Sequence, residues 1–312
     1  MDLEQRILKL VSSNNSYIHD DCAYLSKSHQ LISTDTLAEN VHFNLKHFDA
    51  SKIAHRLFLC NYSDIQSSGG YPEYALLNIS FPSKNFELTQ QIIKYFKKLL
   101  TKYNIKLIGG DTTSSSKIYL SSTFISKPIK KSEIINRRNA KVGDSIYTFK
   151  NIGFSKLGYL SIFKKQNLNK NLLLKSKDQF LKPTIITYSG LFNRCNINSC
   201  MDISDSLYSS LKELSGQSKK KFRIDNLKDI SPLLLKNLSS KNYFSLVLSS
   251  GEEFIPVFTG KLTQQDIKFF KLNRIYVIKI GSVQKGQGVI FTELKNFKNN
   301  TFSHFKNTYL NL

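Results

Sequence analysis

The sequence has few cysteines, and none of them is spaced for a disulfide framework or a zinc site. Cys22, Cys60, Cys195 and Cys200 form no Cys-x-x-Cys pair and have no histidine at zinc-finger spacing. We therefore expect reduced, mostly buried thiols. The sequence also lacks the roughly 20 consecutive apolar residues of a membrane span, and its start lacks the charge and apolar pattern of a signal peptide. These absences predict a cytoplasmic protein that makes no contact with a membrane.

Acidic residues are also scarce. The chain has 23 Asp and Glu against 45 Lys and Arg, which gives a formal net charge of +22. Such an excess would suit a polyanionic partner, but the lysines are scattered in short clusters such as Lys219–Lys221, without the aromatic residues of an RNA-recognition motif. We therefore expect no nucleic-acid partner. In so basic a chain, a group of aspartates must have a local reason.

The length of 312 residues and the hydrophobic content of 40% suit about two domains of roughly 150 residues each. Apolar residues at helical spacing predict helices over residues 50–67 and 87–103. Strand-like segments alternate with these helices, which predicts an α/β (α+β) fold. We expect an N-terminal domain over residues 1–130 and a C-terminal domain over residues 131–312.

Aspartates follow apolar segments in the first half of the chain. Residues 31–32 resemble the end of a buried strand, so Ser33, Thr34 and Asp35 would lie on the loop that leaves it, where α/β proteins often bind ligands. A predicted strand over residues 105–108 is likewise followed by Gly109–Asp111, which we expect to form a tight turn. Oxygen ligands of this kind suit Mg²⁺. The alternative is that these polar residues only cap turns and helices.

Two acidic motifs stand in the second half. Asp202 and Asp205 are three residues apart, with Ser204 between them and a predicted helix from about Ser206. Asp205 could be a metal ligand or simply the N-cap of that helix. Further along, an acidic pair, Glu252 and Glu253, lies between two apolar segments.

Six motifs together resemble the thiamine-monophosphate kinases, whose fold resembles that of aminoimidazole ribonucleotide synthetase. In chain order they are STDTLAENVHF, NYSDIQSSGGYP, LIGGDTT, MDISDSL, SSGEEF and FSHF, and the resemblance covers the chain from about Asp20 to Phe305. The resemblance implies an N-terminal sheet that pairs across a homodimer and a C-terminal domain that closes over the site. It also implies the final step of thiamine diphosphate biosynthesis, which is ATP-dependent phosphorylation of thiamine monophosphate without a covalent phospho-enzyme.

The resemblance assigns a ligand to each matching residue. Several Mg²⁺ ions would be bound by Asp21, Ser33, Thr34, Asp35, Asp64, Asp111, Asp202 and Asp205. ATP would be contacted by Gly110, Asp111, Arg137 and Ser204, and thiamine monophosphate by His42, Glu252 and Phe302. The assigned residue types suit this chemistry, because metal ions neutralise the phosphates that approach one another. An aromatic face and a carboxylate likewise suit a thiazolium cation. No Walker-type phosphate loop is present in the sequence.

The chain departs from the family pattern at several positions, among them His19, Ser206 and Glu253. His19 and Ser206 stand where the family has glycine, and Glu253 is longer than the family's aspartate. Arg138 beside Arg137 leaves the register of the phosphate clamp open by one residue. These departures bear on substrate fit and rate rather than on the type of reaction.

Two alternative functions remain open. The first is another ATP-dependent enzyme of the same superfamily, of the purine synthetase or selenophosphate synthetase type. The latter expects a reactive cysteine in a glycine-rich N-terminal segment, whereas the early cysteine here, Cys22, directly follows an acidic pair. The second is a basic RNA-binding protein, which would need a continuous positive face and an affinity that falls steeply with salt.

Overall fold

The computed structural model describes residues 3–12, 20–128, 134–164, 166 and 168–294. Contacts between Cα atoms divide these residues into two compact units. The first contains the described residues up to Ile65 together with Gly70–Pro128, and the second contains Gln66–Gly69 and the described residues from 134 onward. The expected domain boundary near residue 130 stays a prediction, and the contacts assign the four residues Gln66–Gly69 to the second unit.

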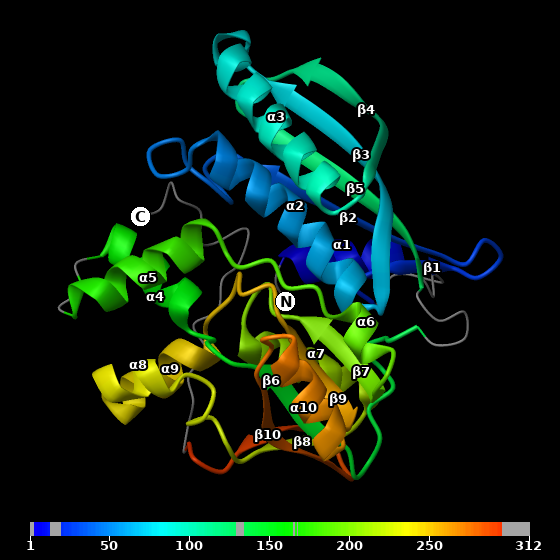
Figure 1. Cartoon of the computed structure of the whole chain (residues 1–312), viewed down its shortest axis with the longest axis vertical. Helices are drawn as coiled ribbons and strands as arrows, with labels where there is room; N and C mark the ends of the chain where they lie inside the picture. The colour runs from blue at the N-terminus through cyan, green and yellow to red at the C-terminus, as the bar shows by residue number, and fades with distance from the viewer. Residues whose placement is uncertain (1–2, 13–19, 129–133, 165, 167, 295–312) are drawn as a thin grey trace. The chain divides into compact units, whose positions relative to one another are not determined.

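The first unit contains a five-stranded sheet with the order β1-β2-β5-β3-β4 (Figure 1). Its strands are β1 (Ala23–Leu25), β2 (Gln30–Ala38), β3 (Gly70–Phe81), β4 (Lys106–Ser114) and β5 (Tyr119–Pro128). The β3–β4 pair is parallel, and the other pairs of this sheet are antiparallel. The predicted mixture of helices and strands in an α/β (α+β) fold is therefore confirmed.

Two helices cover one face of this sheet. They are α2 (Ala50–Ser67) and α3 (Phe86–Lys102), and a short amphipathic helix, α1 (Leu3–Ser12), and a 3-10 turn, η1 (Ser83–Asn85), complete the unit. The ring of Phe124 on β5 lies 5.5 Å from that of Phe58 on α2 and 6.4 Å from that of Phe96 on α3. Both helices therefore bury their apolar sides on the same layer, as their predicted spacing requires.

The expectation that Ser33, Thr34 and Asp35 lie on a loop is wrong, because β2 continues through them to Ala38. The strand stays paired with β5 along this stretch, where Ser33 faces Phe124 and Ala38 faces Tyr119. Its β-branched threonines favour extended backbone. Because side chains alternate along a strand, neighbouring residues here point to opposite faces of the sheet.

The expected turn at Gly109–Asp111 is also wrong, because these residues lie inside β4, which pairs with β3 as far as Ser114. Gly110 has a positive φ of 151° and lies against the carbonyl group of Leu77. A Cβ atom at this position would lie 1.8 Å from that oxygen. Gly110 is therefore needed for the close approach of β3 and β4. The sequence had instead suggested that glycine permits a turn here.

The second unit contains a six-stranded sheet with the order β11-β8-β10-β6-β9-β7. Its strands are β6 (Ser145–Phe149), β7 (Asn196–Asp202), β8 (Lys221–Ile224), β9 (Pro256–Lys261), β10 (Val277–Gln284) and β11 (Gly288–Phe291). Its helices are α4 (Phe154–Phe163), α5 (Lys170–Leu181), α6 (Ser189–Phe192), α7 (Leu207–Ser218), α8 (Pro232–Asn237), α9 (Ser240–Leu248) and α10 (Gln264–Leu272). Aromatic rings fill its core, where the centroids of Phe192 and Phe258 lie 4.7 Å apart.

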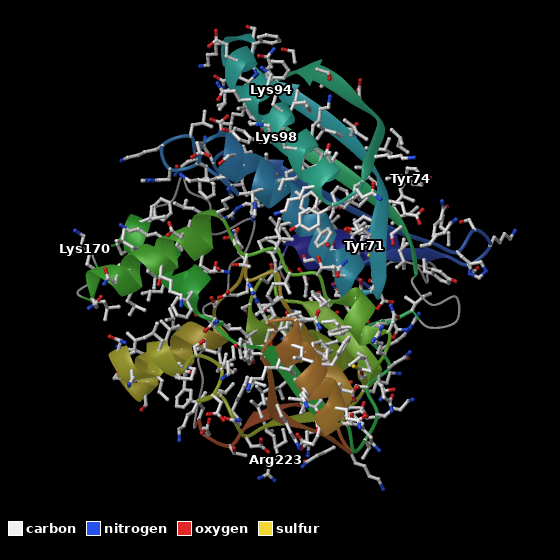
Figure 2. All side chains as sticks on the ribbon, viewed as in Figure 1. Tyr71, Tyr74, Lys94, Lys98, Lys170 and Arg223 are labelled. Carbon is white, nitrogen blue, oxygen red and sulfur yellow. The ribbon has the colours of Figure 1, made fainter. Side chains whose placement is uncertain are left out.

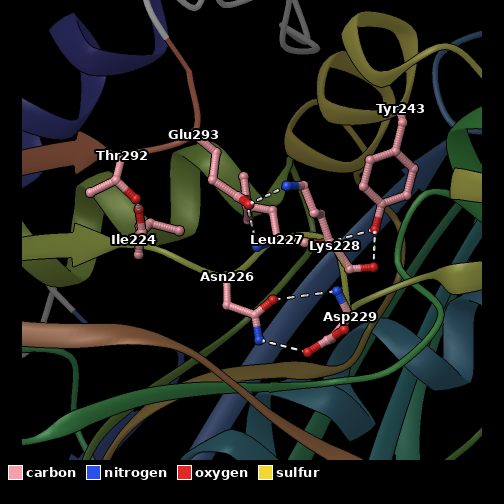
Figure 3. Close-up of polar contacts among 8 residues, drawn as sticks. All are labelled: Ile224, Asn226, Leu227, Lys228, Asp229, Tyr243, Thr292 and Glu293. Carbon is pink, nitrogen blue, oxygen red and sulfur yellow. Dashed lines mark hydrogen bonds and ion pairs between the residues drawn. The ribbon is translucent and has the colours of Figure 1, made fainter.

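Polar contacts fix the segment that follows β8 (Figure 3). The carboxylate of Glu293 accepts a hydrogen bond of 3.1 Å from the backbone N–H of Leu227 and forms an ion pair of 3.2 Å with Lys228. The hydroxyl of Tyr243 donates to the carbonyl oxygen of Leu227 at 2.7 Å, and burial raises the pKa of this hydroxyl to about 12. These contacts hold the end of β11 and the helix α9 to the same loop.

The basic side chains project from separate elements. Figure 2 shows Lys94 and Lys98 on α3, Lys170 at the start of α5 and Arg223 on β8. This spread matches the scattered lysines of the sequence. Among the described helices, none is both long enough and apolar enough to cross a membrane. The cytoplasmic location stays a prediction.

Candidate functional site

In the first unit, an acidic and polar group forms where α2 crosses β2. The hydroxyl of Ser33 lies 2.6 Å from Oδ2 of Asp64 and 2.9 Å from Oδ1 of Asn61, and Ser33 itself is buried. The amide of Asn61 donates in turn to the hydroxyl of Ser122 on β5 at 2.9 Å. These bonds fix the side chain of Asp64 against the sheet, so the predicted residues Ser33 and Asp64 are brought together.

A second carboxylate reaches the same place from the chain just before β1. Carboxylate oxygens of Asp21 and Asp64 lie within 4.8 Å of one another, and Asp35 points to the same face of β2 as Ser33. A set of carboxylate and hydroxyl oxygens without nitrogen or sulfur is the kind that suits Mg²⁺. The residues present in this unit therefore fit a magnesium site.

Thr34 is placed differently from its neighbours. Its hydroxyl lies 2.9 Å from that of Thr123, on the exposed face of the sheet that is opposite Ser33 and Asp35. The next outward pair, Thr36 and Ser121, repeats this contact at 2.9 Å. If Thr34 binds a metal ion on the face of the sheet where Ser33 lies, it must therefore do so through its main-chain oxygen.

His42 lies on the loop that follows β2, and its ring is fixed by the backbone. Its Nδ1 accepts a hydrogen bond of 2.9 Å from the N–H of Ala38. A nitrogen that accepts in this way carries no proton, so the proton of the neutral ring is on Nε2. The neutral ring of His42 therefore has Nε2 as its donor atom.

Gly110 and Asp111 are not brought to this group within the described chain. Both lie on β4, which is separated from β2 by β5 and β3. Three strand spacings correspond to about 14 Å. Asp111 is exposed, and among the described residues it is not part of the group of acids that converges near Asp64.

In the second unit, two predicted motifs are joined by their main chains. The segment after β7, residues 203–205, lies against the segment before β9, residues 250–254. The N–H of Glu252 donates to the carbonyl oxygen of Ser204 at 2.5 Å, and the N–H of Glu253 donates to that of Ile203 at 3.1 Å. A Cβ atom on Gly251 would lie 2.1 Å from the carbonyl oxygen of Asp205. Only glycine allows the two segments to approach this closely.

The helix after the Asp202–Asp205 motif is not capped by Asp205. Its N-cap is Ser206, whose hydroxyl accepts a hydrogen bond of 3.1 Å from the N–H of Ser209. Ser206 has an extended backbone with φ −175°, which any residue can adopt, so glycine is not required at this position. The capping alternative for Asp205 is therefore wrong, and Asp205 itself is exposed. Asp202 is 2% exposed, and a carboxylate buried to this extent needs a compensating partner.

Glu252 has a backbone conformation that is unusual for a residue with a side chain. Its φ is +53°, in the left-handed region, which costs roughly 1–2 kcal/mol outside glycine. Two residues of α4 are close enough to be affected by its charge. Burial lowers the pKa of Lys156, the Lys164 charge lowers it further, and the carboxylate of Glu252 opposes both. Burial raises the pKa of Tyr159, and the charge of Glu252 adds to this rise.

Sequence reasoning treated Glu253 only as a longer version of the family's aspartate. The structure shows a carboxylate that is 1% exposed, and burial raises its pKa to about 7 although hydrogen bonds from Ser250, Gly153 and Ser155 oppose the rise. Lys156 and Tyr159 were missed altogether. The sequence feature that could have indicated Glu253 is the position of an acidic residue within an otherwise apolar segment.

The remaining predicted residues are placed as follows. Arg137 is half-buried, and its carbonyl oxygen accepts a hydrogen bond of 3.0 Å from the hydroxyl of Ser218, whereas Arg138 is exposed. Phe302 and His19 lie outside the described residues.

Comparison with known proteins gives consistent relatives. A family model described as "AIR synthase related protein, N-terminal domain" matches residues 19–126. The thiamine-monophosphate kinase of Buchnera aphidicola subsp. Schizaphis graminum is 35% identical over 305 residues, which cover 92% of this chain and 92% of that protein. The thiamine-monophosphate kinase of Leptospira interrogans is 30% identical over 316 residues and 97% of both chains. A solved structure described as "AaThiL complexed with AMPPCP and TMP" has a TM-score of 0.79 at 23% identity and covers 96% of this chain and 97% of that one, so the fold is shared.

Proposed function

This chain belongs to the thiamine-monophosphate kinase family, and on that basis we propose that it transfers the γ-phosphoryl group of ATP directly to thiamine monophosphate. A phosphate oxygen of thiamine monophosphate attacks the γ-phosphorus, a new P–O bond forms, and the bond to the β-phosphate oxygen breaks. The products are thiamine diphosphate and ADP. No phospho-enzyme is required.

One observation carries this proposal. Ser204 is proposed to contact ATP and Glu252 to contact thiamine monophosphate, and their main chains are joined by a hydrogen bond of 2.5 Å. Transfer between two phosphates requires donor and acceptor to be held next to each other. Two ligand-binding segments that share main-chain bonds would provide such an arrangement.

We propose Mg²⁺ as the resident metal, in more than one copy. The proposed ligands are Asp21, Ser33, Thr34 through its main chain, Asp35, Asp64, Asp111, Asp202 and Asp205. When bound, the ions neutralise the charge that gathers on the phosphate oxygens. Ser33 and Asn61 hold the carboxylate of Asp64 in one orientation and so limit the reorganisation that metal binding requires.

The substrate contacts are proposed from residue chemistry. The Nε2–H of His42 donates to a phosphate oxygen, and the carboxylate of Glu252 attracts the thiazolium cation. Phe302 is proposed to offer that cation an aromatic face. Arg137 is the proposed guanidinium clamp on ATP, and Gly110 is proposed to contact ATP through its main chain.

We also propose that the chain forms a homodimer through the first sheet. The strand β4 is at the edge of that sheet, and each of its nine residues is exposed, including Leu107 and Ile108. An open edge of this kind can pair with another strand. A second copy is also the simplest way for Asp111 to reach a metal group that is three strands away in its own sheet. Sedimentation of the full chain tests this, and Ile108→Lys should shift a dimer towards monomers.

The decisive test of the reaction is formation of thiamine diphosphate from thiamine monophosphate, ATP and Mg²⁺. Asp64→Asn should lower kcat by at least about 100-fold, because it removes a charge from the proposed metal group. Asp178→Asn, which changes an exposed carboxylate on α5, is the matched control and should be as active as the wild type. A folded wild-type chain that binds ATP but forms no thiamine diphosphate would refute the proposal.

A further inference from the structure

The N-terminus of α4 cannot be capped by its own N-cap residue. That residue is Gly153, with a φ of +107°, and a Cβ atom there would lie 2.8 Å from Cδ1 of Leu234. The backbone conformation therefore favours glycine, and a side chain there would also displace Leu234. The free N–H groups of the first turn must find partners elsewhere.

Those partners come from the segment between α9 and β9, about a hundred residues away. Oε1 of Glu253 accepts from the N–H of Gly153 at 2.7 Å and from that of Ser155 at 3.4 Å. The hydroxyl of Ser250 accepts from the N–H of Lys156 at 3.1 Å and donates to Glu253 at 2.5 Å. The side chains of Ser250 and Glu253 thus supply the acceptor oxygens that a capping side chain usually provides at the start of a helix.

The same segment is held on its other side by the main chain of residues 203–205. Glu252 lies between these two attachments, and its N–H donates to Ser204. Its left-handed backbone is unfavourable on its own. The attachments on both sides therefore select the direction in which its side chain points.

The first turns of α4 face the same carboxylate. The charge of Glu252 affects the pKa values of both Lys156 and Tyr159, although burial is the larger cause at each. Any shift of the segment relative to α4 would change the distance between Glu252 and these two side chains.

From these contacts we propose that Glu253 is a positioning residue for the thiamine-monophosphate site. By capping α4 across a buried contact, it fixes the 250–254 segment so that Glu252 is directed at the thiazolium cation. This inference rests on the proposed function. Glu253 touches no substrate itself, and it acts through Glu252 and the first turn of α4.

The test compares Glu253→Ala with Glu253→Gln in the full chain. Alanine removes the acceptor of two N–H groups, whereas the Oε1 of glutamine can still accept both. We expect the KM for thiamine monophosphate to rise about tenfold in the alanine variant, with the KM for ATP unchanged and with recovery in the glutamine variant. The matched control is Asp266→Ala, which removes a carboxylate from the cap of α10 and should leave both KM values unchanged.

Hydrogen exchange of the amides of Gly153 and Ser155 gives a measurement that does not depend on activity. It should be faster in Glu253→Ala and close to wild type in Glu253→Gln. Faster exchange with an unchanged KM would mean that the cap is purely structural, and unchanged exchange would mean that no cap exists; either result overturns the proposal.

Two further outcomes are also decisive. If Glu253→Ala does not fold, Ser250→Ala takes its place, because it removes the bond to Lys156 and one bond to Glu253; an unchanged KM there would overturn the proposal. If the wild type forms no thiamine diphosphate although these amides are protected, the proposed function fails, and the substrate part of this inference fails with it.

Discussion

The burial of Glu253 predicts how the stability of the protein depends on pH. The carboxyl group is 1% exposed, and burial raises its pKa from 4.5 to about 7 in the folded chain. One pKa unit corresponds to about 1.4 kcal/mol. The folded state therefore prefers the protonated form over the ionised form by about 3 kcal/mol more than the unfolded state does.

The direction of the effect follows from which state holds the proton. Below pH 4.5 both the folded and the unfolded chain carry it, and the stabilisation is fully present. Between pH 4.5 and about 7 the unfolded chain releases the proton while the folded chain keeps it. The free energy of unfolding therefore falls as the pH rises through this window, and the loss is complete above the folded pKa.

Urea denaturation of the wild type and of Glu253→Gln tests this directly. Glutamine keeps the acceptor oxygen but does not titrate, so its stability relative to the wild type should increase by about 2–3 kcal/mol between pH 5 and pH 8. Asp178→Asn, on the exposed surface of α5, should show no such pH-dependent gain. A difference between wild type and Glu253→Gln that stays constant over this range would refute the reasoning, because the carboxyl group would then titrate as if it were hydrated.

Three further predictions follow from other contacts. Gly110→Ala should destabilise the chain by about 2 kcal/mol or more in thermal denaturation, since its Cβ would lie 1.8 Å from the carbonyl oxygen of Leu77; an unchanged Tm would contradict this. Ser33→Ala removes a hydrogen bond of 2.6 Å to Asp64, so the Mg²⁺ concentration for half-maximal activity should rise, and an unchanged value would exclude an orienting or ligating role. Although burial acts to raise its pKa, hydrogen bonds from the N-cap residue of α10 lower the pKa of Asp266 below 3.8. The ionised carboxylate should therefore stabilise the wild type at neutral pH, and this stabilisation should be lost as the pH falls below about 4. Asp266→Asn should lack it at every pH, and unfolding curves of equal acid sensitivity for the two proteins would contradict the prediction.

The helices of the first unit were predictable because their apolar residues recur at the helical period and face the sheet. The outcome matched the prediction closely for α2, which spans Ala50–Ser67, and for α3, which spans Phe86–Lys102. The strand β4 was predicted only at its start, within residues 105–108. The rest gave no strand signal, because all nine residues of β4 are exposed and no alternation marks a buried face. Its glycines suggested a turn, since a close approach between strands and a sharp turn favour the same residue.

Part of the candidate site could be predicted from the types of single residues. The acids and hydroxyls near Asp64 were identified as a group, and the structure brings Ser33, Asp21 and Asp64 together. The contact between Glu253 and Gly153 was not predictable, because the two residues are a hundred positions apart and neither is unusual by itself. The cap exists only once β9 and α4 are packed in one unit.

The close approach of Gly251 to Asp205 has a consequence for protein engineering. The two segments that we propose to bind ATP and thiamine monophosphate are joined by main-chain hydrogen bonds, and the side chain of Glu253 joins one of them to the first turn of α4. No other residue can replace Gly251 there without a clash. Substitutions in one segment would therefore be non-additive with substitutions in the others. A graft intended to change the substrate would have to carry residues 153–156, 203–205 and 250–254 together, as a single transplant.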